Sequence, residues 1–323
     1  HGMGTNDEKT IAKGLPQKTM FRQLLDMGLD YRVYFQDVPS VLQFKDMRHK
    51  EARERYRWLD NLYMDLETGD IPEFVWVEPA YFTTPRQEAT DQHPDHDVSL
   101  GEALVRDIYE AVRKSPAWEE TVFMITYDEH GGFFDHVPPP ENVPNPDGLN
   151  ATDDPFDFTR LGVRVPTVVV SPWVKKGSVF HAPDSSASGD EEYGPSQYEH
   201  SSIVSTVVHE LFAPAEGYSA PEYLTKRDEW AKTFGWIFDE LDEVRTDCPE
   251  TLPEVFSIRE HIPDALPAND GSLPLSDLQL ELIHMIAGAA GDNSLTSANL
   301  TEWREKDGGE YCLKMTQKIL SEM

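Results

Sequence analysis

The sequence predicts an α/β fold, and three observations support this prediction. Short apolar runs rich in β-branched and aromatic residues, typical of buried strands, occur at residues 31–35, 74–77, 121–125 and 163–170. Amphipathic stretches with helical spacing alternate with them. Acidic side chains follow two of the apolar runs, at Glu78 and Asp128, and open α/β sheets place ligands at the carboxyl ends of their strands.

Length and composition limit the possible functions. The chain has 323 residues, enough for one large core or two domains, and 39% of them are hydrophobic. No apolar run approaches the roughly 18 residues that span a bilayer. The net charge of -31 argues against nucleic acid as a partner and against simple adsorption to anionic membranes, because both require a basic face. A chain this acidic is suited to binding divalent cations.

The first 80 residues predict alternating helices and strands. A helical face over 20–25 is ended by Gly28, and the strand at 31–35 follows. The charged stretch 45–67, with several aromatic residues, predicts one exposed amphipathic helix. The strand at 74–77 ends at Glu78, which by itself is not a specific sign of a site.

A cluster of histidines and aspartates precedes the next predicted helix. His93, Asp95, His96 and Asp97 lie within five residues, and Ser99 has the spacing of a helix N-cap with a glutamate three residues later. Backbone N–H groups at a helix start favour anions such as phosphate. Either aspartate could instead simply cap the helix, but capping does not account for both histidines. We therefore expect His93 and His96 to be active-site residues.

The stretch from Thr126 to Val137 carries the strongest signal for a site. Asp128, Glu129 and His130 follow the apolar run 121–125, a Gly-Gly pair comes next, and a second Asp-His pair ends the stretch. A polar loop after a core strand is the alternative interpretation. Paired carboxylates provide hard oxygen ligands for calcium, magnesium or manganese, and adding histidines would extend the choice to iron or zinc. The two acids can converge on one ion only if the turn swings Glu129 round.

The remaining chain predicts recognition loops and C-terminal helices. A proline-rich loop runs to about residue 157, residues 182–196 are Ser-, Gly- and acid-rich, and His200 opens a helix where it could bind phosphate or act as a cap. Helices are expected near 278–286 and 311–320, in a C-terminal appendage over 256–323 that follows a domain over 1–255. Cys248 and Cys312 can pair or remain thiols.

These parts together suit phosphoryl chemistry. A metal and helix N-termini would hold phosphate oxygens, and a histidine would protonate the leaving oxygen. Walker-type loops and Gly-x-Ser-x-Gly elbows are absent from the sequence. Their absence excludes P-loop kinases, and serine hydrolases that use that elbow, as candidate functions.

Four motifs occur together and in order, and they resemble the non-specific phospholipase C branch of the phosphoesterase family, which also includes bacterial phospholipases C and acid phosphatases. The motifs are 93–98, 126–138, 160–166 and 196–202, and residues 247–252 resemble the end of the plant-type core. The resemblance covers about residues 1–255.

The resemblance implies an alkaline-phosphatase-like sandwich, with a central, mostly parallel sheet flanked by helices. It implies hydrolysis of the phosphodiester of glycerophospholipids with the help of a divalent metal ion: calcium, magnesium, manganese or zinc. It assigns the metal ligands to Asp128 and Glu129, and the active-site histidines to His93 and His96 with His130 as a neighbour. The substrate would be a phospholipid or another phosphate ester, with peripheral membrane contact.

The chain departs from the family pattern at its start. A Glu-Asn-Arg-Ser-Phe-Asp-His element and the Ser or Thr nucleophile of a later loop are absent from the sequence, and His1 does not begin a signal peptide. The chain thus resembles the C-terminal two thirds of such an enzyme, lacking its N-terminal part, and an open sheet edge or exposed apolar face is expected. Two alternatives are an acid phosphatase acting on phosphomonoesters and a non-catalytic protein that binds lipid or metal. Asn150 and Asn299 begin glycosylation triplets, which are compatible with a secretory route.

Overall fold

The structure, a computed structural model, describes residues 7–151, 156–181, 193–261 and 270–322. It divides into two compact units. Unit 1 comprises Lys18–Asp30 and Ala117–Cys248, and unit 2 comprises Asn6–Gln17, Tyr31–Pro116 and Pro249–Met323. No helix among the described residues is both long and apolar enough to cross a bilayer.

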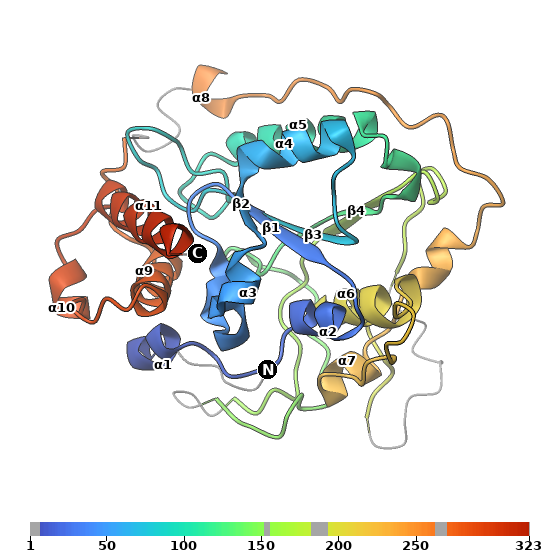
Figure 1. The fold of residues 1–323 in the computed structure, drawn as a ribbon, viewed down its shortest axis with the longest axis horizontal. Helices are drawn as coiled ribbons and strands as arrows, with labels where there is room; N and C mark the ends of the chain where they lie inside the picture. Colours follow the sequence, from blue (N-terminus) through green and yellow to red (C-terminus); the bar gives the residue numbers. More distant parts are fainter. Residues whose placement is uncertain (1–6, 152–155, 182–192, 262–269, 323) are drawn as a thin grey trace. The chain divides into compact units, whose positions relative to one another are not determined.

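Unit 2 is built on a parallel sheet of three strands. Strands β1 (Tyr31–Phe35), β2 (Tyr56–Trp58) and β3 (Phe74–Glu78) lie in the order β2-β1-β3 (Figure 1). The register pairs Val33 with Tyr56 and Tyr31 with Phe74. Most side chains of β1 are buried, as expected for a central strand of a parallel sheet. The strands expected at 31–35 and 74–77 are confirmed.

The single helix expected over 45–67 is wrong. That stretch forms the 3-10 turn η2 (Lys45–Arg48), the short helix α3 (Lys50–Arg53), strand β2 and helix α4 (Leu59–Thr68). Tyr56 is buried and its hydroxyl donates to the carbonyl of Met47 at 2.5 Å, while the amide of Val33 donates to the carbonyl of Arg55 at 3.0 Å. Pairing with β1 therefore overrides the local helix propensity of these residues. The periodicity of the sequence cannot predict such a pairing.

Helices cover the sheet of unit 2. Helix α4 packs on β1 and β2, and α5 (Val98–Lys114) lies beside it (Figure 1). Asp97 caps α5, because its Oδ1 accepts from the amide of Ser99 at 3.0 Å. The short 3-10 helix η1 (Ser40–Gln43) precedes η2.

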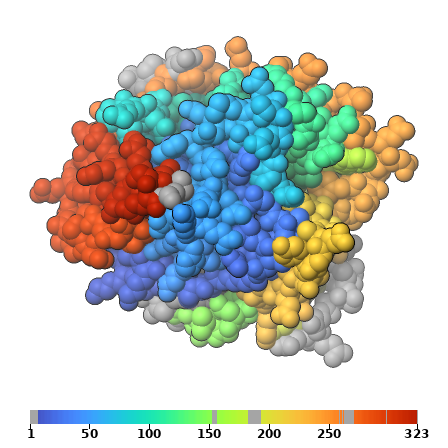
Figure 2. Space-filling model, viewed as in Figure 1, coloured from blue at the N-terminus to red at the C-terminus, as the bar shows by residue number. Residues whose placement is uncertain are grey.

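The C-terminal helices belong to unit 2. Helix α9 (Asp277–Ala289) packs against α1 (Glu8–Lys13) and α11 (Glu305–Ser321), and in Figure 2 orange residues of the C-terminal part lie directly against dark blue residues near the N-terminus. Gly288 permits this approach, because a Cβ there would meet the carbonyl of Ala12. The two predicted helices are confirmed, with the short helices α8 (Ile258–His261) and α10 (Ser297–Leu300) in addition. The boundary expected near residue 255 stays a prediction.

Unit 1 contains an antiparallel strand pair and several short helices. Strand β4 (Phe123–Thr126) pairs with β5 (Thr167–Val170), with Phe123 opposite Val170. Both strands were expected to be buried, but they are half-buried to exposed, and β5 begins only after Pro166, which has no N–H for a ladder. The mostly parallel sheet expected for the fold is thus seen in unit 2, whereas the described sheet of unit 1 is antiparallel. The other elements of unit 1 are α2 (Met20–Asp26), η3 (Trp118–Glu120), α6 (His200–Thr206), the π-turn η4 (Val207–Leu211), α7 (Lys226–Trp230) and η5 (Gly235–Phe238).

The long loop after residue 137 is fastened by hydrogen bonds. Arg227 donates to the carbonyls of Pro144 at 2.8 Å and Phe158 at 2.5 Å. Cys248 and Cys312 are both buried and neither forms a disulfide, so the possible pairing is not made. Most of the segment 182–196 lies outside the described residues.

Candidate active site

Asp128 and Glu129 follow β4 and are both exposed. Asp128 Oδ1 accepts from the amide of Glu129 at 3.0 Å, and Glu129 Oε2 accepts from the amide of Gly131 at 2.6 Å. Gly131 and Gly132 have φ values of 65° and 73°, which glycine adopts without strain. One oxygen of each carboxylate therefore accepts a hydrogen bond that shapes the turn, and the other oxygen takes no part in these two bonds.

His130 lies in the same turn with a defined tautomer. Its Nδ1 is 2.8 Å from the carbonyl of Phe133, and because a carbonyl only accepts, Nδ1 carries the proton. The amide of Phe133 donates back to the carbonyl of His130 at 3.2 Å. Nε2 is consequently the nitrogen that can exchange a proton with a ligand.

Two further contacts, which the sequence did not predict, hold this turn in place. His200 Nε2 donates to the carbonyl of Tyr127 at 2.8 Å, so this histidine braces the residue before Asp128. Arg164 binds Asp135 through two bonds, Nε to Oδ2 at 2.6 Å and a terminal nitrogen to Oδ1 at 2.8 Å. The Arg164 guanidinium holds the pKa of Asp135 well below its usual range. The only sequence signal for the second contact was that both residues fall in motifs of the family resemblance.

In unit 2, His96 lies between two buried carboxylates. Its Nδ1 is 2.6 Å from Asp91 Oδ1 and its Nε2 is 2.9 Å from Glu305 Oε1. Burial alone would lower the pKa of His96, but the hydrogen bonds and charges of the two acids raise it to about 10. His96 is therefore an imidazolium at neutral pH, and both of its N–H groups are engaged.

His93, by contrast, keeps one nitrogen available. Its Nδ1 donates to the carbonyl of Pro94 at 3.0 Å, so Nε2 is the ring nitrogen outside this bond, and its ring centre is 6.3 Å from that of His96. Gln92 and Asp95 on either side have φ values of 60° and 78°. Left-handed non-glycine residues are uncommon and gather at functional sites, which fits the expectation for His93.

Sequence reasoning missed Asp91 and Glu305, the two acids that bind His96, and also missed the buried acid Asp37. Glu305 starts α11, 209 residues beyond His96, in a segment with no visible chemistry in the sequence. Asp37 is fully buried, where its carboxylate accepts from the amides of Val38, Tyr81 and Phe82, and burial with the charge of Asp91 raises its pKa to about 8. Only tertiary contacts could reveal these residues.

The candidate residues fall into two groups. His93 and His96 belong to unit 2, and Asp128, Glu129 and His130 belong to unit 1. Within the described ranges, no three or more His, Cys, Asp or Glu side chains are grouped so that they could hold a metal ion. The structure thus brings together the two carboxylates and His130 in one turn, and the two histidines in one loop.

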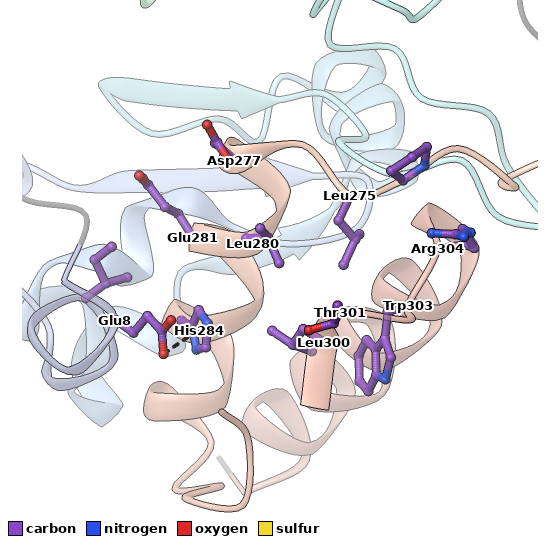
Figure 3. Close-up of a pocket in the computed structure, with 12 residues that line it drawn as sticks. Glu8, Leu275, Asp277, Leu280, Glu281, His284, Leu300, Thr301, Trp303 and Arg304 are labelled. Atoms are coloured by element: carbon purple, nitrogen blue, oxygen red, sulfur yellow. Dashed lines mark ion pairs between the residues drawn. The ribbon is translucent and has the colours of Figure 1, made fainter. Parts of the chain in front are cut away.

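A cavity of about 370 Å³ lies in unit 2 but involves none of the candidate residues. Its walls come from α1, α9, α10 and the turn before α11, with Leu280 and Leu300 facing each other across it and His284 paired with Glu8 at 3.7 Å (Figure 3). Arg304 at its edge directly precedes Glu305.

Comparison with known proteins gives matches over the whole chain. Residues 1–212 match the family described as the Phosphoesterase family. Non-specific phospholipase C1 of Arabidopsis thaliana is 41% identical over an alignment of 332 residues that covers 99% of this chain and 58% of that protein. Non-specific phospholipase C4 of the same plant is 40% identical, covering 100% of this chain and 57% of that protein.

A bacterial relative matches a shorter part. Phospholipase C B of Mycobacterium tuberculosis is 31% identical over 128 residues, 36% of this chain and 23% of that protein. Nearly all of this chain is thus aligned with the two plant relatives, but it spans less than two thirds of the length of either one.

Proposed function

The chain belongs to the phosphoesterase family, and on this premise we propose that it hydrolyses the phosphodiester of glycerophospholipids in the manner of a phospholipase C. The products would be diacylglycerol and a phosphorylated head group. The observation that carries the proposal is the turn after β4, which presents two exposed carboxylates and a histidine with a free Nε2, in a chain similar over 99% of its length to a non-specific phospholipase C.

We assign proton transfer to His130, which lies in the same turn as the two carboxylates, and name His93 of unit 2 as a second candidate by the same criterion. His130 and His93 each donate Nδ1–H to a backbone carbonyl, which orients the ring and leaves Nε2 to bind or release a proton. Hydrolysis consumes one water: its oxygen bonds to phosphorus and gives up a proton, the bond between phosphorus and the diacylglycerol oxygen breaks, and that oxygen takes up a proton. His96, charged and held by two acids, would serve as a fixed positive group that positions its loop.

Asp128 and Glu129 are the proposed ligands of a divalent cation. Their donor set fits a hard cation, because each has a carboxylate oxygen beyond those bonded to the turn, and Mg²⁺ commonly keeps several waters and binds only one or two carboxylates. Calcium, manganese and zinc remain alternatives. A bound cation would neutralise charge on the phosphate.

The proposal also covers the type of α/β fold and the contact with the membrane. We infer an alkaline-phosphatase-like sandwich for the complete family domain, and peripheral contact with the lipid surface where the substrate lies. The parallel sheet of unit 2 and its flanking helices support the first inference.

An assay of two substrates tests the function. The chain is incubated with phosphatidylcholine vesicles or p-nitrophenyl phosphate, with each of the four cations and with a chelator. We expect phosphocholine release from the lipid, lost with the chelator and in His130→Ala, but retained in His136→Ala, an exposed histidine of the same loop. Hydrolysis of the monoester alone would indicate a phosphatase, and cation binding without turnover would indicate a non-catalytic protein.

A further inference from the structure

Two adjacent phenylalanines form the tip of the turn after β4. Phe133 is 71% exposed and Phe134 is 92% exposed, the highest value among the described large apolar side chains. Gly132, next to them, has no atom within 4 Å of where a Cβ would lie. The tip therefore projects into open space rather than lying on the surface of unit 1.

The turn is fixed at its base, so the tip does not fold back. His130 and Phe133 exchange two hydrogen bonds, Glu129 binds the amide of Gly131, and Asp135 accepts from the amide of Val137 at 3.1 Å while it pairs with Arg164. Because hydrogen bonds fix the backbone of the turn, the two rings stay exposed to water. This leaves a large apolar area uncovered, which favours an apolar partner.

The charges around the tip indicate which surface it fits. Residues 131–134 carry no charge, and Asp135 is neutralised by Arg164. Asp128 and Glu129 at the base are exposed acids, in a chain of net charge -31. An anionic surface would repel them, whereas a zwitterionic lipid surface would not.

We propose that Phe133 and Phe134 insert into the interfacial region of a zwitterionic phospholipid bilayer and so bring the turn of Asp128, Glu129 and His130 to the head groups. The inference rests on the proposed function, because it takes the bilayer as the place of the substrate. Aromatic side chains are suited to this depth. Removing both rings should weaken partitioning by about 100-fold or more, given the free energy of burying two rings.

Vesicle sedimentation measures this directly. We compare the wild type with Phe133→Ser/Phe134→Ser and with a control, Val179→Ser/Phe256→Ser, which removes two other exposed apolar side chains. Phosphatidylcholine and phosphatidylglycerol vesicles are used, and lipid hydrolysis is followed in the same samples. We expect the tip variant alone to lose binding, and the wild type to prefer phosphatidylcholine.

A second measurement does not depend on stability. Phe134→Cys, labelled with a polarity-sensitive dye while the native cysteines are buried, should shift its emission to the blue on adding phosphatidylcholine vesicles, and His136→Cys should shift less. Equal partitioning of the tip variant and the wild type, or no shift at position 134, overturns the inference even if lipid is hydrolysed. Binding through the tip without hydrolysis would instead leave the inference standing and refute the proposed function.

The remaining outcome concerns protein partners. If the tip variant changes the sedimentation coefficient of the chain without lipid, the tip is a contact between two copies, and the membrane inference is wrong.

Discussion

His96 Nε2 lies 2.9 Å from Glu305 Oε1, although 209 residues separate them in the chain. Asp91 binds the other ring nitrogen at 2.6 Å, and all three side chains are almost fully buried. Glu305 also accepts from the amide of Thr83. The start of the last helix is thereby tied to the loop of the candidate histidines within unit 2.

Glu305→Gln is expected to destabilise the protein by about 3 kcal/mol, because it removes one charged partner of a buried ion pair. Urea unfolding checks this value. Glu302→Gln, an exposed neighbour, is the control and should change little. A loss for Glu305→Gln no larger than the control would show that Asp91 alone holds His96.

The stability should fall as the pH rises above neutrality. The pKa of His96 is raised to about 10 in the folded state, from 6.5 in an unfolded chain, so its contribution is complete below pH 6.5 and is lost on the way to pH 10. Asp37, with its pKa raised to about 8, adds a decline between about pH 4 and 8. Above pH 8 the decline from Asp37 is complete, but the buried thiol of Cys312, whose pKa burial raises, adds a decline at higher pH, so a comparison with His96→Gln is needed to isolate His96.

Unfolding free energies at pH 8 and 10 measure this effect. The wild type should lose stability between these values and His96→Gln should lose much less. Parallel curves for the two proteins would contradict the assignment of a protonated His96.

His200→Ala should loosen the segment before Asp128. The hydrogen bond from His200 Nε2 to the carbonyl of Tyr127 is worth about 1 kcal/mol. We expect faster amide exchange at the end of β4 and a lower turnover of lipid substrate, partly restored by His200→Gln, whose amide can also donate. His136→Ala serves as the control, and unchanged exchange in His200→Ala would refute the bracing role.

Arg164→Gln should free the second half of the same turn. Without the guanidinium, Asp135 loses its two side-chain bonds, its pKa returns toward the usual range, and the amide of Val137 should exchange faster. Lys175→Gln, which breaks an exposed ion pair elsewhere in unit 1, is the control. Hydrogen exchange followed by mass spectrometry resolves the two segments.

Asp128→Asn and Glu129→Gln should each reduce divalent-cation affinity by about tenfold or more, since each would lose a charged ligand. Calorimetric titration with magnesium, calcium, manganese and zinc gives the affinities. Asp147→Asn removes a charge from an exposed acid of unit 1 and should leave them unchanged. Equal affinities in all variants would show that the cation binds elsewhere than at this turn.

Local pattern was sufficient for most elements. The strands at 31–35 and 74–77 and the helices α5 and α9 follow from apolar periodicity, which depends on neighbours in the sequence, although Asp97 and not Ser99 is the N-cap of α5. The division of 45–67 could not be predicted, because β2 exists only through its pairing with β1. The half-exposed state of β4 and β5 was missed for the same reason: an apolar run does not reveal how much of it other elements cover.

By itself, the sequence determined the α/β class, the family and the residue types of the candidate site, since these are written in short continuous motifs. Only the tertiary structure decided which nitrogen of His93 and of His130 is free, that His200 and Arg164 hold the turn after β4, and that Asp91 and Glu305 keep His96 protonated. The protonation and orientation of these histidines depend on groups that folding brings within about 3 Å. The separation of two residues along the chain does not indicate whether they make such a contact.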